Sequence, residues 1–227
     1  MAFKLLALLL LGLCAAAADA SKTKVTLYDE ALCPFCRKYV SEVLAPLFEN
    51  GLSDYIDLRI VALGNARKDE EGELVCQHGP VECIGNRILD CAMDLHPGQD
   101  NWFPLVLCLE DSGDFGNRTA VEECAWRSGV DAGSILECAE GPRGKELVEA
   151  AYNETWSLVP EHRWVPWVVV NDLPLFDAGD YVQAAVCLML PEDNRPDACY
   201  VDPFPDMVLS DITPVQPRAV SQETVIV

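Results

Sequence analysis

The sequence predicts an α/β fold in which two half-units flank a helical insertion. A strand–helix–strand pattern opens the chain, a strand–strand–helix pattern closes it, and the stretch between them follows helical periodicity. Half of the 227 residues are hydrophobic, which is enough for a packed core in one domain with an insertion or in two small domains. We expect disulfide bonds to hold the insertion together, because cysteines recur along it.

The first half-unit consists of two strands joined by a helix. Residues 24–29 alternate apolar and polar side chains, and 55–63 form a second strand-like run. Between them, 37–48 carries apolar residues at helical spacing. This order predicts a parallel pair of strands with a right-handed crossover. The polar and charged stretch 64–72 is then expected to form a loop or a hairpin.

The helical insertion is expected at about residues 76–160. Its pattern becomes helical at 81–95, and shorter segments continue that pattern. These segments are 102–109, 119–128, 134–140 and 144–158. Together they predict an insertion of four or five short helices.

The second half-unit begins at Pro166. Residues 167–171 form a buried-type strand, 173–176 is its expected antiparallel partner, and 181–190 predicts a helix. This order predicts a hairpin that a final helix closes.

Both ends of the chain are expected to lie outside the folded domain, which would span 21–202. Residues 1–20 carry a positive charge, a short apolar run and a small-x-small cleavage sequence, which predict a secretory signal peptide. A buried helix or a membrane anchor is the alternative, although the apolar run is too short for a bilayer and no other stretch is long enough. Residues 203–227 contain four prolines and predict a disordered tail or a removable propeptide.

The net charge of −21 excludes some partners. A surface this acidic repels nucleic acid and anionic lipid, so we expect neither as a partner. The charge suits an acidic compartment, in which part of the carboxylates become neutral, but solubility alone explains it equally well. Asn117 and Asn153 begin N-glycosylation sequons, which become plausible glycan sites behind a signal peptide.

Ten cysteines remain once the signal peptide and Cys14 are removed, and an even number in a secreted chain points to disulfide bonds. Two of them, Cys33 and Cys36, form a Cys-x-x-Cys motif. The other eight are assigned to structural disulfides, whose pairing the sequence leaves open. They are Cys76, Cys83, Cys91, Cys108, Cys124, Cys138, Cys187 and Cys199.

The motif Cys33-Pro34-Phe35-Cys36 directly follows the first predicted strand. It is therefore expected on the first turn of a helix, where the helix dipole and unpaired backbone N–H groups stabilise a thiolate. We assign Cys33 as the nucleophile because it lies at the helix N-terminus, and Cys36, one turn in and partly covered, as the resolving thiol. Pro34 suits the first turn because it has no N–H to satisfy there.

Two alternatives to a redox pair remain open. Cys-x-x-Cys also occurs in zinc sites, and Cys76, His78 and Cys83 could supply further ligands. An oxidising compartment disfavours such a thiolate cluster and the spacing is unusual for zinc, so we assign no metal and no cofactor. The second alternative is a purely structural disulfide between Cys33 and Cys36.

The complete pattern resembles the thioredoxin arrangement with a helical lid, as in the periplasmic disulfide oxidoreductases. The predicted fold class is therefore a thioredoxin-like α/β fold with a disulfide-stapled helical insertion. In this arrangement a proline at the position of Pro166 faces the cysteine pair and holds the backbone open for a substrate strand. We expect the Val165–Pro166 bond to be cis, a form found in about 5–6 % of such bonds, with a trans proline at a strand start as the alternative. The expected substrate-binding residues are Pro34, Phe35, Val165 and Pro166.

The segment 76–91 carries the most specific motif of the chain. It reads C-Q-H-G-P-V-E-C-I-G-N-R-I-L-D-C and resembles, position for position, the signature of the gamma-interferon-inducible lysosomal thiol reductase (GILT) family. The resemblance covers about residues 24–200. The sequence departs from the family pattern at two places: Trp164 stands where Tyr is common, and Asp172 stands where Gly often occurs. These departures leave the type of the hairpin turn open and do not affect the expected chemistry.

The resemblance implies a soluble, glycosylated thiol reductase of the secretory pathway, located in the lysosome or vacuole or outside the cell. Such an enzyme would reduce disulfides of partly unfolded proteins at acidic pH, with a small thiol as reductant. Its signature cysteines would be structural, while His78, Glu82 and Asn86 would orient the insertion or line the site. A secretory-pathway disulfide oxidase or isomerase remains an alternative, as does a disulfide-rich secreted binding protein without turnover.

Activity at acidic pH requires a thiol with a lowered pKa. An ordinary cysteine would be about 0.03 % thiolate at pH 5, whereas thiols at helix N-termini reach pKa values of about 3.5–7.5. We predict a pKa of Cys33 in the lower half of that range. Backbone N–H groups should be the main cause, with Arg37 or Lys38 adding to it.

Overall fold

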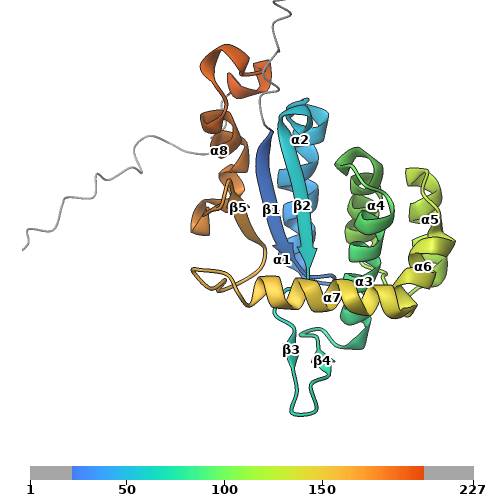
Figure 1. The fold of residues 1–227 in the computed structure, drawn as a ribbon. Helices are drawn as coiled ribbons and strands as arrows, with labels where there is room; N and C mark the ends of the chain where they lie inside the picture. The colour runs from blue at the N-terminus through green and yellow to red at the C-terminus, as the bar shows by residue number, and fades with distance from the viewer. Residues whose placement is uncertain (1–21, 202–227) are drawn as a thin grey trace, which may run out of the picture.

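The computed structural model describes residues 22–201 (Figure 1). The expected signal peptide, 1–20, and the proline-rich tail, 203–227, lie outside the described residues. A sheet forms the centre of the described part, with helices behind it and a group of further helices to one side (Figure 1). This is the predicted α/β arrangement.

The sheet has four strands in the order β2–β1–β5–β6. β1 (Thr23–Asp29) pairs in parallel with β2 (Ile56–Ala62), as the strand–helix–strand pattern predicted. β5 (Trp167–Val170) is antiparallel to β1, and β6 (Leu173–Pro174) is antiparallel to β5. β1 is therefore an inner strand, and its C-terminal end leads directly into the Cys-x-x-Cys motif.

The crossover from β1 to β2 is one continuous helical rod. It consists of α1 (Pro34–Tyr39), a π-helical turn (Val40–Leu44) and α2 (Ala45–Glu49), and the junction residues keep helical backbone angles. The rod begins at Pro34, so the Cys-x-x-Cys motif lies on its first turn as predicted, and a proline without an N–H is well suited to the first helical position. A 3₁₀ turn (Leu52–Tyr55) then leads into β2.

A small hairpin separates β2 from the insertion. It consists of β3 (Arg67–Lys68) and β4 (Leu74–Val75) and projects from the lower end of the molecule in Figure 1. Gly72 in its turn has a φ of 85°, a conformation that glycine adopts without a steric cost. The hairpin occupies the polar stretch for which the sequence predicted a loop or a hairpin.

The insertion contains five helices. They are α3 (Pro80–Leu95), α4 (Gln99–Ser112), α5 (Arg118–Ser128), α6 (Ala132–Glu140) and α7 (Pro142–Thr155). Asn117 and Asp131 are the N-cap residues of α5 and α6, and their side chains accept hydrogen bonds from backbone N–H groups of the first turn. α4 extends beyond the predicted 102–109 at both ends, because Gly98 and Gly113, with positive φ, bound it.

The closing half-unit differs from the prediction from Leu175 onward. β6 has two residues, and a 3₁₀ helix (Phe176–Tyr181) follows where the strand was expected to continue. Leu175, with φ of −82° and ψ of −11°, already leaves the extended conformation, and Phe176 follows with a φ of 50°. Asn171 and Asp172, also with positive φ, form the tight turn between β5 and β6. α8 (Val182–Met189) then closes the unit.

One hydrophobic core joins the sheet to the insertion. Leu27 of β1, Leu89 of α3 and Leu105 of α4 belong to it, and all three are fully buried. Phe48 of α2 and Phe103 of α4 stack with their ring centroids 4.0 Å apart. The burial of this shared apolar surface places the insertion against the end of the sheet that carries the cysteine motif.

Within residues 22–201, four disulfides connect the eight cysteines that lie outside the Cys-x-x-Cys motif. They are Cys76–Cys83, Cys91–Cys138, Cys108–Cys124 and Cys187–Cys199. The second joins α3 to α6, and the third joins α4 to α5. The last joins α8 to a 3₁₀ turn (Asp197–Cys199), which follows another such turn (Glu192–Asn194). The pairing, which the sequence left open, therefore follows from which helices pack together.

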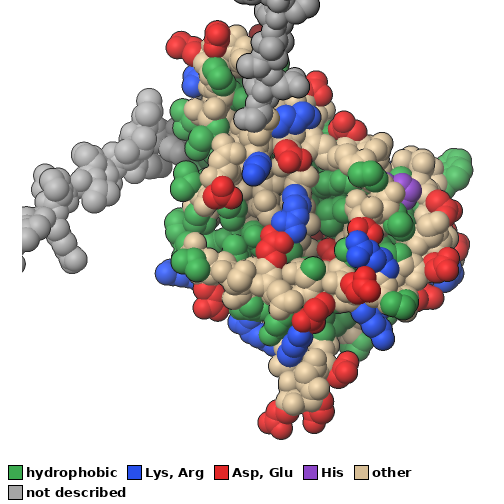
Figure 2. Space-filling model, viewed as in Figure 1, with side chains coloured by type: hydrophobic (Ala, Val, Ile, Leu, Met, Phe, Trp, Pro, Cys, Tyr) green, Lys and Arg blue, Asp and Glu red, His purple; other side chains and the backbone are tan. Residues whose placement is uncertain are grey.

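The surface carries charges of both signs. On the face shown in Figure 2, acidic and basic side chains are interspersed around apolar ones. Within the described residues, the structure contains no helix that combines the length and the apolar character needed to cross a bilayer.

Candidate redox active site

Cys33 is the N-cap residue of α1. Its backbone is extended, with φ of −73° and ψ of 118°, and its Sγ accepts a hydrogen bond from the backbone N–H of Cys36 at 3.4 Å. Leu32, with a φ of 70°, lies in the turn that leads from the end of β1 into the helix. Pro34 occupies the first helical position. The thiol therefore lies at a helix N-terminus, where the sequence predicted it.

Cys33 and Cys36 are the free cysteines of the described residues. The exposed fraction is 4 % for Cys33 and 0 % for Cys36. Cys33 is therefore the more exposed of the two residues, and a substrate disulfide cannot reach Cys36 without a rearrangement. This order of exposure supports the assignment of Cys33 as the nucleophile, which stays a prediction.

The pKa of Cys33 is lowered to about 6. The largest cause is hydrogen bonding with the side chain of Cys36, and burial acts against it. Backbone N–H groups of Cys36 and Phe35 and the charge of His78 lower the pKa further. By contrast, the pKa of Cys36 is raised well above that of an ordinary cysteine, chiefly by burial. The pair thus combines one thiol that ionises readily with one that stays protonated.

Two details of the predicted cause of the pKa shift are wrong. The largest cause is the side chain of Cys36, and not the backbone N–H groups that we expected. The charged residue among the main causes is His78, and not Arg37 or Lys38. Arg37 instead donates a hydrogen bond to the backbone carbonyl of Asp111.

Two buried carboxyl groups lie near the cysteine pair. Asp29, the last residue of β1, is fully buried, and burial raises its pKa while its interaction with Cys36 opposes that shift. Glu110 of α4 is buried as well, and burial raises its pKa, with the charges of Asp29 and Cys33 adding to the effect. Neither residue stood out in the sequence. The place of Asp29 just before the motif was a signal for it, whereas Glu110 had none.

Asn86 connects the signature segment to the loop that carries the cysteines. It is fully buried, its Oδ1 accepts a hydrogen bond from the backbone N–H of Ala31 at 2.8 Å, and its Nδ2 donates to the carbonyl of Leu63 at 3.4 Å. The neighbouring Gly85 approaches the same loop closely, since a Cβ there would lie 2.6 Å from the Cβ of Ala31. Asn86 is therefore placed to orient the insertion toward the site.

His78 and Glu82 meet Glu30, which our sequence analysis did not single out. His78 Nδ1 lies 2.6 Å from Glu82 Oε2 and 3.3 Å from Glu30 Oε1. Cys33 interacts electrostatically with both His78 and Glu30. His78 and Glu30 therefore act on the charge of Cys33, while Glu82 contacts His78. That these signature residues line the site stays a prediction.

The Val165–Pro166 bond is cis, as the sequence predicted. Val165 is buried and packs in one small cluster with Cys33 and Cys36. Pro166 and Phe35 line a groove of about 380 Å³, and Phe35 is 71 % exposed. The structure thus brings the four residues expected to bind substrate to the vicinity of the cysteine pair.

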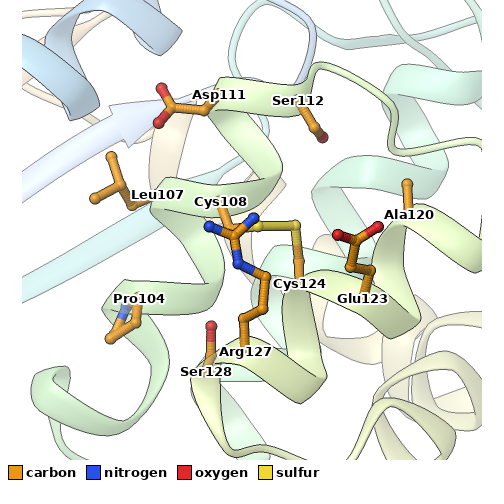
Figure 3. Close-up of a pocket in the computed structure, with 10 residues that line it drawn as sticks. All are labelled: Pro104, Leu107, Cys108, Asp111, Ser112, Ala120, Glu123, Cys124, Arg127 and Ser128. Atoms are coloured by element: carbon orange, nitrogen blue, oxygen red, sulfur yellow. A yellow bond between two sulfur atoms is a disulfide. The ribbon is translucent and has the colours of Figure 1, made fainter.

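Another hollow, of about 570 Å³, lies between α4 and α5 (Figure 3). The Cys108–Cys124 disulfide joins the two helices there, and Glu123 and Arg127 supply charged groups. Neither motif cysteine lines it, so we do not place the redox chemistry in this hollow.

Both predicted glycosylation sites are exposed. Asn117 caps α5, with its Oδ1 accepting a hydrogen bond from Thr119 N–H and its Nδ2 donating to Asp114. Asn153 lies on α7, where its Nδ2 is 3.5 Å from Glu149. A glycan would attach to Nδ2 and would leave Oδ1 of Asn117 available as the cap of α5. Glycosylation stays a prediction for both residues.

Fold and site together define the class of protein. A thioredoxin-like sheet with two free cysteines at the start of its first helix, and a cis proline beside them, is typical of thiol–disulfide oxidoreductases. Among solved structures, the chain is similar to oxidised BdbD from Bacillus subtilis, with a TM-score of 0.56 and 12 % identity over 74 % of this chain and 87 % of that one. It is also similar to DsbA from Chlamydia trachomatis, with a TM-score of 0.52 and 13 % identity over 72 % and 86 %.

Sequence comparisons then show the family. The profile named gamma interferon inducible lysosomal thiol reductase (GILT) matches residues 24–128. The gamma-interferon-inducible lysosomal thiol reductase of Carassius auratus is 34 % identical over 191 residues, which cover 80 % of this chain and 73 % of the relative. Its namesake in Mus musculus is 31 % identical over 179 residues, which cover 78 % and 71 %. The chain belongs to the GILT family, as the signature predicted, and is a thiol–disulfide oxidoreductase.

Proposed function

We propose that this protein reduces disulfide bonds of partly unfolded proteins at acidic pH. The observation that carries the proposal is the thiol of Cys33, which caps α1 and has a pKa lowered to about 6. At pH 5 such a thiol is about one-tenth thiolate, whereas an ordinary cysteine is about 0.03 % thiolate. Because thiolate is the attacking species, this difference supports activity in an acidic compartment.

Cys33 carries out the first step. Its thiolate attacks one sulfur of the substrate disulfide, a Cys33–substrate disulfide forms, and the substrate S–S bond breaks. The second substrate sulfur leaves as a thiolate and takes a proton from solvent. The helix N-terminus stabilises the attacking thiolate before the bond forms.

Cys36 carries out the second step. Its pKa is raised by burial, so it stays a thiol until the mixed disulfide has formed. It then loses its proton and attacks Cys33 Sγ, which forms the Cys33–Cys36 disulfide and releases the remaining substrate thiol. Two electrons have passed from the cysteine pair to the substrate. Two equivalents of a small thiol would restore the pair and be oxidised to their own disulfide.

The surroundings of the pair suit an extended, apolar substrate segment. Phe35 is largely exposed beside the motif, and Pro166 lies at the same groove. The cis bond of Pro166 precedes β5, and a substrate strand could align with the backbone at this point. An unfolded protein exposes such extended segments together with its disulfides, which is why we propose this substrate class.

We also propose a lysosomal or vacuolar location, reached through the secretory pathway. The relatives described above are lysosomal by name, and four disulfides require an oxidising route of folding. A signal peptide at 1–20 and glycans on Asn117 and Asn153 belong to the same proposal, as does a mature domain of 21–202.

One observation favours the opposite direction, in which the protein oxidises thiols. A thiolate that is stabilised in the reduced state makes a cysteine pair more oxidising. The pKa of Cys33, about 6, lies far above the value of about 3.5 found in a strongly oxidising pair, so we favour reduction. A reduction potential measured against glutathione decides between them, since a reductase should have a potential below that of the glutathione couple.

The test of the proposed function is reduction of insulin disulfides with a small thiol as electron donor. Wild-type protein should be active at pH 5, and Cys33→Ser should lose at least about 99 % of that activity because the nucleophile is removed. Cys36→Ser should keep the first step and accumulate a mixed disulfide with insulin, which is visible by mass spectrometry.

The two serine variants control for each other, because each removes one thiol from the same short motif. If Cys33→Ser rather than Cys36→Ser accumulated a mixed disulfide with insulin, Cys36 would be the nucleophile and Cys33 the resolving thiol. Absence of activity at pH 5 and pH 7, in protein whose Cys33–Cys36 disulfide is shown to be reducible, would favour a binding protein without turnover.

A further inference from the structure

Three side chains that could ligate a metal meet beside the cysteine loop. They are Glu30 from the turn after β1, His78 from the loop before α3, and Glu82 from the first turn of α3. One ligand atom of each lies within 4.8 Å of the other two. This cluster is distinct from the Cys-x-x-Cys motif, and neither Cys76 nor Cys83 belongs to it because they form a disulfide.

Glu30 is the unusual member of the cluster. It is 1 % exposed, and its Oε1 has no hydrogen-bond partner although it is buried. That oxygen is directed at the cluster, because it lies 3.3 Å from His78 Nδ1. Glu82 is fully buried as well. Burial raises the pKa of Glu30 to about 7, so two carboxylates at this place need either a proton or a nearby positive charge.

Backbone groups hold both carboxylates in place from behind. Glu30 Oε2 accepts a hydrogen bond from the N–H of Asn65 at 2.7 Å, which leaves Oε1 free. Glu82 accepts hydrogen bonds from the N–H groups of Gln77 and His78 at 3.2 and 2.6 Å. Such outer contacts orient the ligand oxygens of metal sites.

We propose that Glu30, His78 and Glu82 form a binding site for a divalent transition-metal ion of the zinc class. Tetrahedral zinc with bonds of about 2.0–2.1 Å separates neighbouring ligand atoms by about 3.3 Å. The distance from Glu30 Oε1 to His78 Nδ1 equals this value, and the 2.6 Å from His78 Nδ1 to Glu82 Oε2 needs only a small opening.

The donor set selects the kind of ion. One imidazole nitrogen and two carboxylate oxygens suit zinc, whereas calcium and magnesium prefer oxygen alone. A dication would neutralise the two carboxylates, and the partly exposed His78, with 32 % of its side chain accessible, leaves a route from solvent. Three protein ligands leave a fourth position open, as in catalytic zinc sites. Cys33 interacts electrostatically with His78 and Glu30, so the charge of the ion would also act on the nucleophile.

The competing explanation is that a protonated His78 pairs with both carboxylates and no metal binds. Zinc titration of the oxidised full chain at pH 7, followed by calorimetry, separates the two. The Cys33–Cys36 disulfide keeps thiols out of the measurement. We expect one zinc ion per chain, and no binding of Mg²⁺ at the same concentration.

Variants then assign the ligands. His78→Gln and Glu30→Gln should each weaken zinc binding by at least about tenfold, since each removes one ligand of three. His96→Gln is the matched control, because His96 lies at the far end of α3 and outside the cluster. Its zinc affinity should equal that of the wild type.

Thermal unfolding provides a readout of folding and binding together. Zinc should raise the midpoint of the wild type and of His96→Gln, because a ligand that binds the native state stabilises it. Glu30→Gln keeps an acceptor for Asn65 N–H. If His78→Gln does not fold, the zinc affinity of Glu30→Gln tests the proposed site. No stoichiometric zinc binding, an equal affinity for Mg²⁺, or undiminished zinc binding by Glu30→Gln would each overturn the proposal.

Discussion

Cys33 acquires its low pKa from groups on different parts of the chain. The side chain of Cys36 is the largest cause, and N–H groups of the first helical turn and the charge of His78 add to it. Burial acts in the opposite direction, because it disfavours the thiolate. Most of the shift therefore comes from the motif itself, whose spacing brings the second cysteine one turn into the helix and next to the first.

Replacement of Cys36 by alanine should raise the pKa of Cys33. The substitution removes the largest lowering interaction, so the midpoint of pH-dependent alkylation should move from about 6 upward by about one unit or more. Alkylation of Cys33 at pH 5 should slow accordingly, because less thiolate is present. The measurement is the rate of iodoacetamide labelling between pH 4 and pH 9.

Cys36→Ser is the matched control for this change. Its hydroxyl keeps a donor for the Cys33 sulfur, so its midpoint should rise less than that of Cys36→Ala. Equal midpoints in wild type and Cys36→Ala would mean that the backbone N–H groups set the pKa without help from the second cysteine.

At the scale of elements, α3 determines how the insertion meets the cysteine loop. Gly85 and Asn86 lie on consecutive positions of this helix and both contact the segment at Ala31. The missing side chain of Gly85 permits the close approach, and Asn86 then satisfies the backbone N–H of Ala31. The geometry of the redox loop thus depends on the packing of an element that is distant from it in the sequence.

Gly85→Ala should destabilise the protein. The added Cβ would lie 2.6 Å from the Cβ of Ala31 and 2.9 Å from Cγ of Phe115, so the loop or the helix must shift. We expect the free energy of unfolding to fall by about 1–3 kcal/mol. Urea unfolding followed by tryptophan fluorescence measures this change.

Gly133→Ala serves as the control for that experiment. Gly133 lies near the start of α6, and a Cβ there meets no atom closer than 3.6 Å. Alanine is favoured over glycine in a helix, so the free energy of unfolding should stay the same or rise by up to about 1 kcal/mol. If both substitutions had the same effect, close packing of α3 on the loop could not be the cause.

At the scale of the whole molecule, buried carboxyl groups and the acidic surface favour stability at low pH. Burial raises the pKa of Asp90 to about 8 and raises that of Glu110 well above its usual value. A carboxyl with a raised pKa in the folded state takes up a proton on folding. Its contribution to stability is complete below the unfolded pKa of about 4 and is lost as the pH rises through the folded pKa. Self-repulsion from the net charge of −21 acts in the same direction.

We therefore expect the thermal unfolding midpoint to be higher at pH 5 than at pH 8. Asp90→Asn should reduce this difference, because it removes one ionisation and keeps an acceptor for the N–H of Ala62. Its stabilising effect should be larger at pH 8 than at pH 5. The exposed Asp57→Asn is the control and should leave the pH dependence unchanged. A midpoint that rises from pH 5 to pH 8 in the wild type would contradict the argument.

Local patterns predicted the elements well where one periodicity dominated. The alternation in β1 and the apolar spacing of the first helix led to the correct strand–helix–strand unit. The predicted strand 173–176 was too long, since Leu175 already has helical backbone angles, and nothing in the apolar pattern reports backbone angles. The predicted helix 102–109 was too short, because the glycines that bound α4 lie beyond its apolar stretch.

The sequence by itself determined the order of the elements, the place of the Cys-x-x-Cys motif at a helix start and, through the segment 76–91, the family. Each of these is encoded in residues that are near one another along the chain. Only the tertiary structure decided how the eight remaining cysteines pair, that His78 meets Glu30, and that Glu110 is buried near the redox pair. These features depend on distant segments being packed together, and the burial that results from this packing sets the pKa values on which the chemistry rests.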